Sequence, residues 1–164
     1  MKRFANIQQF QKYLYERTAA LASAEAKALD KVGALVAADA KARIGEYQDE
    51  AGPFPGWRDL ADSTLADKAR KGFAVPNPLE RTGEMRDSIE FSRAPERVTI
   101  GSPEKTALWQ ELGTGGPAPG PDGYHVPPRP FLGPALFVNA EEAAKICGEE
   151  VAVWLAGGVR PNQW

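Results

Sequence analysis

Three side chains are the candidates for acid–base chemistry in this sequence. His125 is the single histidine, Asp122 lies just before it, and Glu111 precedes both. An imidazole beside a carboxylate is the arrangement that a general base requires. However, no Gly-x-Ser-x-Gly elbow and no His-Glu-x-x-His pair accompanies them. Since a lone histidine beside prolines is more often structural, the pattern disfavours catalysis and predicts a protein that is not an enzyme.

A cofactor or metal site is disfavoured on similar grounds. The run Gly113, Thr114, Gly115 and Gly116 superficially resembles a phosphate-binding loop. It lacks the Gly-Lys-Ser/Thr ending of a P-loop and follows a predicted helix instead of a strand. The one cysteine, Cys147, excludes an internal disulfide, and no Cys/His cluster of zinc type is present. The sequence therefore predicts no cofactor and no metal.

The charge is small in total but unevenly placed. The 164 residues carry a net charge of -2, whereas a protein that coats nucleic acid is usually basic. Residues 1–44 hold eight basic and four acidic residues, a net of +4, which leaves -6 for the remainder. This split is typical of a solvated helix, or of a basic arm that meets the acidic body of another copy. No targeting segment and no apolar run of about 20 residues occurs, so no membrane association is expected.

Residues 4–45 are predicted to form one long helix or two in tandem. Phe4, Ile7, Phe10 and Leu14 recur at spacings of three and four, and the following residues are rich in alanine. A small body cannot cover so long a helix, so we expect an arm that packs partly on its own body and partly on neighbours. We divide one domain, 1–164, into a helical arm (1–50), an α+β body (51–157) and an irregular tail (158–164).

The centre of the body is predicted to contain a small antiparallel sheet. Ile89 and Phe91 alternate with polar residues, and the same alternation returns before Gly101, which predicts a hairpin of residues 88–93 against 97–102. A short helix over 104–112 should follow, with an apolar face directed inward that comprises Leu108, Trp109 and Leu112. Tryptophans at apolar positions are expected in the core or at interfaces, namely Trp57, Trp109 and Trp154.

The 16 glycines and 14 prolines concentrate in residues 113–134. Residues 113–123 form a predicted loop of a length at which structureless segments are often functional. Residues 124–126 are predicted to form a third strand, and a final helix over 134–156 is expected to pack on the sheet. The apolar seam of that helix includes Cys147 and Trp154, while its acidic residues, Glu150 among them, should face water. The fold class is α+β.

Four motifs occur in a characteristic order: WRDLADST at 57–64, LERTGEMRDSI at 79–89, LWQELGT at 108–114 and PPRPFLGPA at 127–135. Together they resemble the neck and tail-completion proteins of tailed bacteriophages, a head–tail joining, tail-terminator-like superfamily. The resemblance covers roughly residues 50–157. Met85 stands where that superfamily usually has leucine, and Ala107, Leu108 and Trp109 replace a start led by tyrosine.

The resemblance implies a set of structural motif residues rather than catalytic ones. They are Thr82, Gly83, Arg86, Ser88, Ile89, Glu111, Gly113, Thr114, Pro128, Arg129, Pro130, Phe131 and Leu132. Thr82 is expected to cap a short helix and Gly83 to permit a positive φ. Arg86 and Glu111 are candidates for an ion pair, and Arg129 for a bidentate contact. The candidate interface residues are Gly115, Gly116, Pro117, Pro119, Pro121, Tyr124 and Trp164.

The resemblance also implies a structural virion protein, assembled in the host cytoplasm, that forms a homo-oligomeric ring, commonly six-fold, in the neck or at the head-proximal end of the tail. Such a ring completes the tail and joins it to the head, with neighbouring neck, connector and tail-tube proteins as partners. An acidic body suits a conduit that touches passing DNA weakly. Two alternatives stay open: a DNA- or nucleotide-handling enzyme of a mobile element that uses Glu111, Asp122 and His125, and an assembly chaperone that leaves before maturation.

Overall fold

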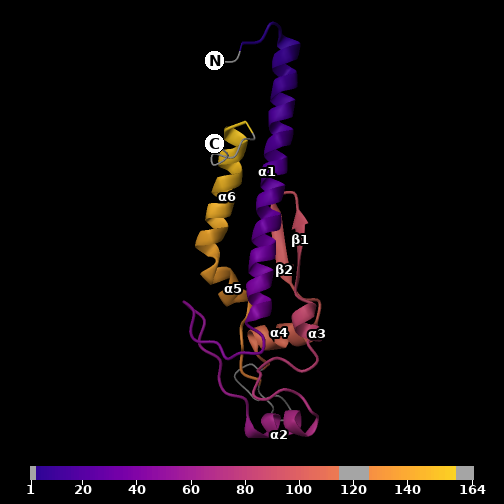
Figure 1. Cartoon of the computed structure of the whole chain (residues 1–164), viewed down its shortest axis with the longest axis vertical. Helices are drawn as coiled ribbons and strands as arrows, with labels where there is room; N and C mark the ends of the chain where they lie inside the picture. Colours follow the sequence, from indigo (N-terminus) through magenta and orange to yellow (C-terminus); the bar gives the residue numbers. More distant parts are fainter. Residues whose placement is uncertain (1–2, 115–125, 158–164) are drawn as a thin grey trace.

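The computed structural model describes residues 3–114 and 126–157 and confirms the α+β fold class. Figure 1 shows a long helix flanked by a hairpin and a C-terminal helix, with the shorter elements gathered at one end. In chain order the elements are α1 (Ile7–Ala42), α2 (Asp62–Arg70), α3 (Glu84–Asp87), β1 (Glu90–Ala94), β2 (Arg97–Gly101), α4 (Lys105–Leu112), α5 (Leu132–Val138) and α6 (Ala140–Leu155). Across the described residues no helix combines the length and the apolar character that a membrane crossing requires.

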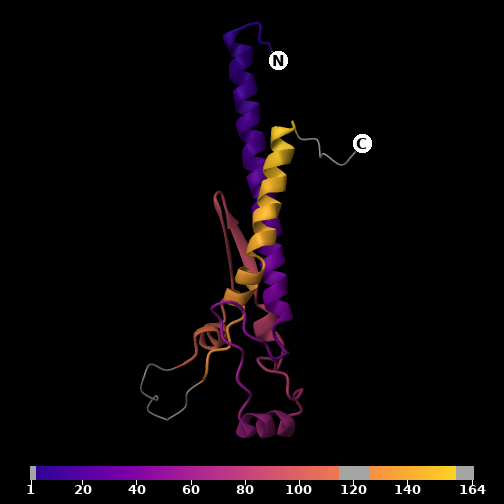
Figure 2. The same cartoon turned by 90° about the vertical axis from the view of Figure 1, so that its left-hand side faces the viewer.

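Helix α1 is one continuous helix of 36 residues, the first of the two arrangements predicted for residues 4–45. It begins after Asn6, whose side chain accepts a hydrogen bond from the backbone N–H of Gln9 at 2.9 Å. This is the ordinary way to satisfy a donor that the first helical turn leaves free. Buried positions of α1 start only at Ala24. The helix therefore contributes its C-terminal half to the core, while its first turns, before Arg17, extend past the end of α6 (Figures 1 and 2).

The hairpin confirms the predicted antiparallel pair with slightly shorter strands. Its register places Phe91 opposite Ile100 and Arg93 opposite Val98, with a two-residue turn between Ala94 and Arg97. One face of the hairpin lies on α1 at Gly33, where an added Cβ would meet the side chains of Phe91 and Val98 at 2.5 and 2.8 Å. A residue without a side chain is therefore needed there for the close approach.

The prediction that the C-terminal helix packs on the sheet is wrong. Helix α1 lies between the hairpin and α6, and α6 packs against α1 (Figure 1). The outer face of the hairpin presents polar side chains such as Glu90, Ser92 and Thr99, all exposed. Such a face offers no apolar surface on which an amphipathic helix could be buried. Helix α1, in contrast, has buried residues along its C-terminal half and contacts both α6 and the hairpin.

The predicted final helix is divided at Asn139 into α5 and α6. Helix α6 runs antiparallel to α1, because Trp154 near its end donates its indole N–H to the carbonyl of Arg17 at 3.0 Å. Glu150, expected to face water, is instead buried at 5% exposure and forms an ion pair with Lys31 of α1. The charge is tolerated at this buried place because it has a partner.

Helix α4 presents the opposite face to the one predicted. Leu108, Trp109 and Leu112 are 58, 50 and 71% exposed, while Ala107 is buried. Ala107 shares its helical face with Gln110 and Glu111, at spacings of three and four, and these two residues bind the chain that follows the loop. The backbone carbonyl of Gln110 and the side chain of Glu111 thus fix the orientation of α4, and the apolar side chains of its other face remain exposed to solvent.

The core lies where α1, α3, α4 and α5 meet. Its largest fully buried side chains include Phe131, Ile89 and Val36. Trp57 is buried as predicted, and Cys147 packs at the edge of this cluster. The predicted third strand is reduced in the described residues to one isolated bridge between Thr114 and Val126, while Tyr124 and His125 lie outside them.

Candidate functional site: the loop clamp

The two described residues that flank the Gly/Pro-rich segment 115–125 are joined directly. The backbone N–H of Thr114 donates to the carbonyl of Val126 at 3.0 Å, and the N–H of Val126 donates to Oγ1 of Thr114 at 3.1 Å. Together with Gln110, Glu111 and Arg129, described next, these residues form what we call the loop clamp. The two described ends on either side of residues 115–125 are therefore held together at one place.

Glu111 makes the most extensive contact of the clamp. Its carboxylate accepts three backbone N–H groups at the start of α5: Oε2 from Phe131 at 2.7 Å and Leu132 at 3.0 Å, and Oε1 from Gly133 at 2.8 Å. These donors have no partner within the helix, and a negative charge at a helix N-terminus is favourable. Bonds to an ionised acceptor are stronger than neutral ones. Glu111 thus fixes α4 to α5 across the base of the loop.

Arg129 joins the clamp to a third segment. Its backbone N–H donates to the carbonyl of Gln110 at 2.7 Å, and its guanidinium donates to the carbonyls of Arg58 and Asp59 at 3.0 to 3.3 Å. The side chain is only 5% exposed, and burial lowers the pKa of the guanidinium. Among the described residues its ligands are main-chain carbonyls rather than a carboxylate. Arg129, proposed for a bidentate contact, thus binds two main-chain carbonyls of the chain itself.

Two further contacts tighten the same junction. Trp57 donates its indole N–H to the carbonyl of Pro130 at 2.9 Å, beside the contacts of Arg129 with the next residues of that segment. Gly113 has a φ of +76°, and an added Cβ would lie 2.9 Å from the carbonyl oxygen of Val126 and 3.1 Å from Pro128. Both the backbone conformation and the lack of space require glycine here. One junction thus brings together residues from three of the sequence motifs, namely Trp57, Glu111, Gly113 and Arg129.

The motif at residues 79–89 forms a second, separate cluster. Gly83 has a φ of +85° and precedes α3, as expected. The N-cap residue of α3 is Gly83 and not the predicted Thr82; Oγ1 of Thr82, one position earlier, accepts the N–H of Glu84 at 3.4 Å. Ser88 donates to the carbonyl of Met85 at 2.7 Å, and its hydroxyl also lies 2.7 Å from that of Ser102. These contacts turn the chain from α3 into β1.

The predicted Arg86–Glu111 ion pair is wrong. Arg86 binds Oε1 of Glu80 at 2.8 Å and Asp87 at 3.3 Å, while Glu111 is occupied by the α5 backbone. The two motif clusters meet in the core, where Ile89 and Phe131 are both fully buried. The association of the two clusters in the core is therefore apolar. Opposite charge alone does not show which residues lie close together in the fold, so it could not identify the partners of Arg86 and Glu111.

Several predicted site residues cannot be placed. The interface candidates Gly115, Gly116, Pro117, Pro119, Pro121, Tyr124 and Trp164, together with Asp122 and His125, lie outside the described residues. Within residues 3–114 and 126–157 no group of three or more His, Cys, Asp or Glu side chains could hold a metal ion. The contacts that define the clamp are hydrogen bonds that join α4, α5 and residues 57–59.

One polar cluster was missed by sequence reasoning. Asp67 binds Lys71, Arg70 and Arg81, and these bonds, that from Lys71 first, lower its pKa from 3.8 to about 2. The neighbouring Lys68 is buried, donates to the carbonyls of Asn77 and Glu80, and has a pKa lowered by burial. The spacing of three and four residues between Asp67, Arg70 and Lys71 could have predicted their ion pairs. No feature of the sequence predicts the contacts of Lys68 with the distant carbonyls.

Comparison with known proteins identifies a family. No curated protein and no solved structure matches the chain. The model of the phage virion morphogenesis family matches residues 5–147, which include α1, the hairpin, the loop clamp and the first half of α6. This match extends beyond the motif resemblance, which left the N-terminal arm uncovered. The chain, whose clamp and core are built from the motifs named above, therefore belongs to the phage virion morphogenesis family.

Proposed function

We propose that this virion morphogenesis protein forms a homo-oligomeric ring in the phage neck or at the head-proximal end of the tail, where it completes the tail and joins it to the head. Its partners are other copies of the chain, six in the ring that the resemblance to neck proteins implies, and the adjoining neck, connector and tail-tube proteins. DNA passes without tight binding, because the body outside the arm is acidic.

The observation that carries this proposal is the uncovered apolar seam on the first turns of α1, before Arg17. Ile7, Phe10 and Leu14 are 59, 39 and 46% exposed, and they continue the helical stripe whose lower part α6 covers. Helix α6 ends at Leu155, near Arg17, so α1 extends past it (Figure 2). An isolated protein rarely presents an aligned apolar stripe to water, and such stripes mark contact surfaces.

The loop clamp supports the joining role. A surface that docks another ring needs a rigid base, because ordering a loose segment on binding costs conformational entropy. The hydrogen bonds of Thr114, Glu111 and Arg129 fix both flanks of segment 115–125 to α4, α5 and residues 57–59. The clamp therefore supplies a stable base for the candidate joining surface.

The same contacts weigh against the enzyme alternative. A general base needs a carboxylate oxygen that is free to take a proton from substrate. Both oxygens of Glu111 already accept backbone N–H groups. Glu111 is thus a structural residue, and the catalytic set proposed with Asp122 and His125 loses one of its three members.

The test is complementation of a phage that lacks the gene. We expect DNA-filled heads and separate tails without the chain, and restored particles that contain it in about six to twelve copies when it is supplied. Replacement of residues 115–125 by Asn-Gly, a two-residue turn that suits the Thr114–Val126 bridge, should preserve folding and abolish joining. A Glu104→Gln variant, altered on the surface near the N-terminus of α4, is the matched control.

The outcomes separate the alternatives. Absence of the chain from purified virions would overturn the proposal and favour the chaperone. Normal joining by the Asn-Gly variant would remove segment 115–125 as the joining surface. Loss of particles with His125→Ala alone, in a folded protein, would reinstate the enzyme.

A further inference from the structure

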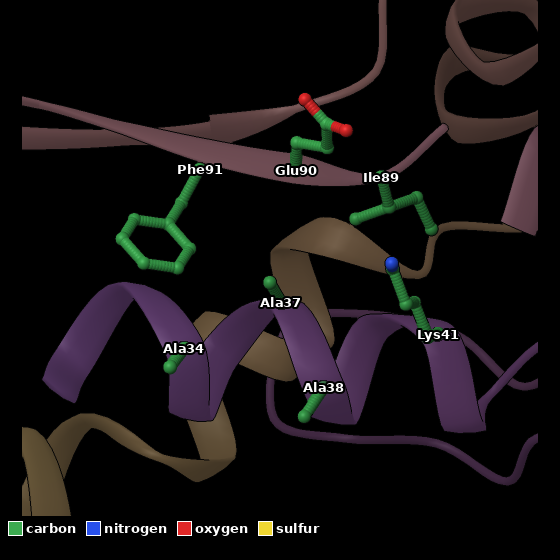
Figure 3. A pocket seen from close by; sticks show the side chains of 7 residues that line it. All are labelled: Ala34, Ala37, Ala38, Lys41, Ile89, Glu90 and Phe91. Atoms are coloured by element: carbon green, nitrogen blue, oxygen red, sulfur yellow. The ribbon is translucent and has the colours of Figure 1, made fainter. Parts of the chain in front are cut away.

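A groove runs between α1 and the beginning of the hairpin (Figure 3). Its volume is about 410 Å³, and it is lined by Ala34, Ala38 and Lys41 on α1 and by Ile89, Glu90 and Phe91 on the strand side. In Figure 3 Ile89 and Phe91 point toward the helix while Glu90 points away from it. Phe91 remains 37% exposed, although it lies on the inward face of the hairpin. Small side chains on the helix leave this side of the hairpin open.

The groove borders a free sheet edge. The sheet of the described residues has two strands, so each strand has one unpaired edge. A two-residue turn makes Ala94 and Arg97 a hydrogen-bonded pair, and pairing then alternates along the ladder. The N–H and C=O groups of Phe91 and Arg93 therefore point outward, and no hydrogen bond to them is formed within the described residues. An unpaired edge is a template for a strand from another chain.

The other edge of the same hairpin is a suitable strand for this position. Residues 98–100 of β2 are Val, Thr and Ile, with no charge and no proline to protect the edge. Glu90 of β1 and Arg97 of β2 lie on the polar outer face, and neither forms an ion pair with a described residue. When Phe91 lies opposite Val98 of a second copy, Glu90 is diagonal to Arg97 of that copy, within reach of a long side chain.

Pairing of like edges lacks this complementarity. An antiparallel β1–β1 contact places Glu90 beside Ser92 and Ala94 of the second copy, and a β2–β2 contact places Arg97 beside Thr99 and Gly101. Neither charge then meets an opposite one. The charges therefore select the contact of unlike edges, β1 of one copy with β2 of the next.

The helices fit the same repeat. Two strands occupy about 9.6 Å across a sheet, and packed helices lie 8–10 Å apart. If neighbouring copies are displaced by the width of one hairpin across the sheet, their α1 helices therefore lie at packing distance from each other. Ala34 and Ala38, both exposed in the single chain, are small enough for that approach, and the second copy then fills the groove.

We propose that the groove and the free edge of β1 accept strand β2 of a second copy of this chain, so that neighbouring hairpins form one continuous antiparallel sheet. This contact specifies how neighbouring copies would meet in the proposed ring, and it rests on the proposed function. It is heterologous, since different surfaces meet, and a heterologous contact closes into a ring when its rotation divides a full turn.

The test is a charge exchange followed by native mass spectrometry and sedimentation. Glu90→Arg and Arg97→Glu should each weaken self-association by about tenfold per contact, because an opposite pair becomes a like pair. The double variant E90R/R97E should recover the oligomer, and so should an equimolar mixture of the two single variants. Glu149→Arg, on the exposed side of α6, is the matched control and should assemble normally.

A second variant probes the groove without altering the strands. Ala38→Arg occupies the groove from an exposed helix position and should reduce assembly, while Ala19→Arg, elsewhere on α1, should not. Circular dichroism checks that each variant is folded. A wild-type chain that stays monomeric, single exchanges without effect, or a double exchange that fails to recover would each overturn the proposal.

Failure of this contact and failure of the proposed function give different results. A chain present in virions whose double exchange does not recover assembly keeps the neck role and loses the strand contact. A chain absent from virions whose exchanges behave as expected keeps the strand contact and loses the neck role.

Discussion

Removal of the Glu111 carboxylate is the most direct test of the loop clamp. In Glu111→Ala three backbone N–H groups of residues 131–133, bound at 2.7 to 3.0 Å in the native protein, lose their acceptor at once. A hydrogen bond to a charged group contributes about 1.5–3 kcal/mol net, and water recovers part of this at a half-buried site. Taking about 1 kcal/mol for each bond, we expect a loss of about 3 kcal/mol in the free energy of unfolding.

Glu111→Gln should lose less, about 2 kcal/mol, since the amide retains one oxygen acceptor but directs an NH₂ group at backbone donors. The matched control is Glu104→Ala, at an exposed position that makes no side-chain cap bond, which should stay within about 0.5 kcal/mol of wild type. Urea unfolding followed by tryptophan fluorescence measures all three variants.

Hydrogen exchange distinguishes a local from a general loss. In Glu111→Ala the amides of residues 131–133 should exchange faster than the amides of α1, because only the former lose their direct acceptor. A Glu111→Ala protein within about 0.5 kcal/mol of wild type, or with unchanged exchange at 131–133, would refute the role assigned to the carboxylate.

Three further changes test other contacts. Gly133→Ala should destabilise by about 1–3 kcal/mol in urea unfolding, because its Cβ would lie 2.5 Å from an aromatic ring, whereas Gly148→Ala, with nothing within 4 Å, should stabilise by about 0.5–1 kcal/mol; equal effects would contradict this. Trp57→Phe keeps an aromatic side chain but replaces the indole by a smaller phenyl ring and removes the 2.9 Å hydrogen bond, so a loss of at least about 1–2 kcal/mol is expected, and an unchanged unfolding midpoint would show that the bond is dispensable. Hydrogen bonds from Lys71 and then Arg70 and Arg81 lower the pKa of Asp67 from 3.8 to about 2, so their stabilisation is present above pH 3.8 and is lost as pH falls toward 2; Asp67→Asn should lack this part of the acid dependence, and parallel acid titrations would argue against it.

The sequence predicted those elements whose formation depends on interactions between residues close together in the chain. The alanine-rich apolar stripe of the arm predicts α1, and the alternation around Ile89 and Phe91 predicts the hairpin. Gly83 was expected to permit a positive φ and has one. In each case the deciding interactions lie within a few residues along the chain, so the sequence pattern contains them. The break at Asn139 was missed, since helix propensity does not mark a one-residue change of direction.

Only the tertiary structure decided which face of each short helix is buried and which charges meet. Helix α4 has an apolar face and a face with Ala107 and Glu111, and burial chose the second because Glu111 binds backbone donors about twenty positions further along the chain. For the same reason Arg86 meets Glu80 and not Glu111, and Glu150 is buried against Lys31. Periodicity identifies the faces of a helix but not their neighbours, because the neighbours are set by contacts between residues far apart in sequence.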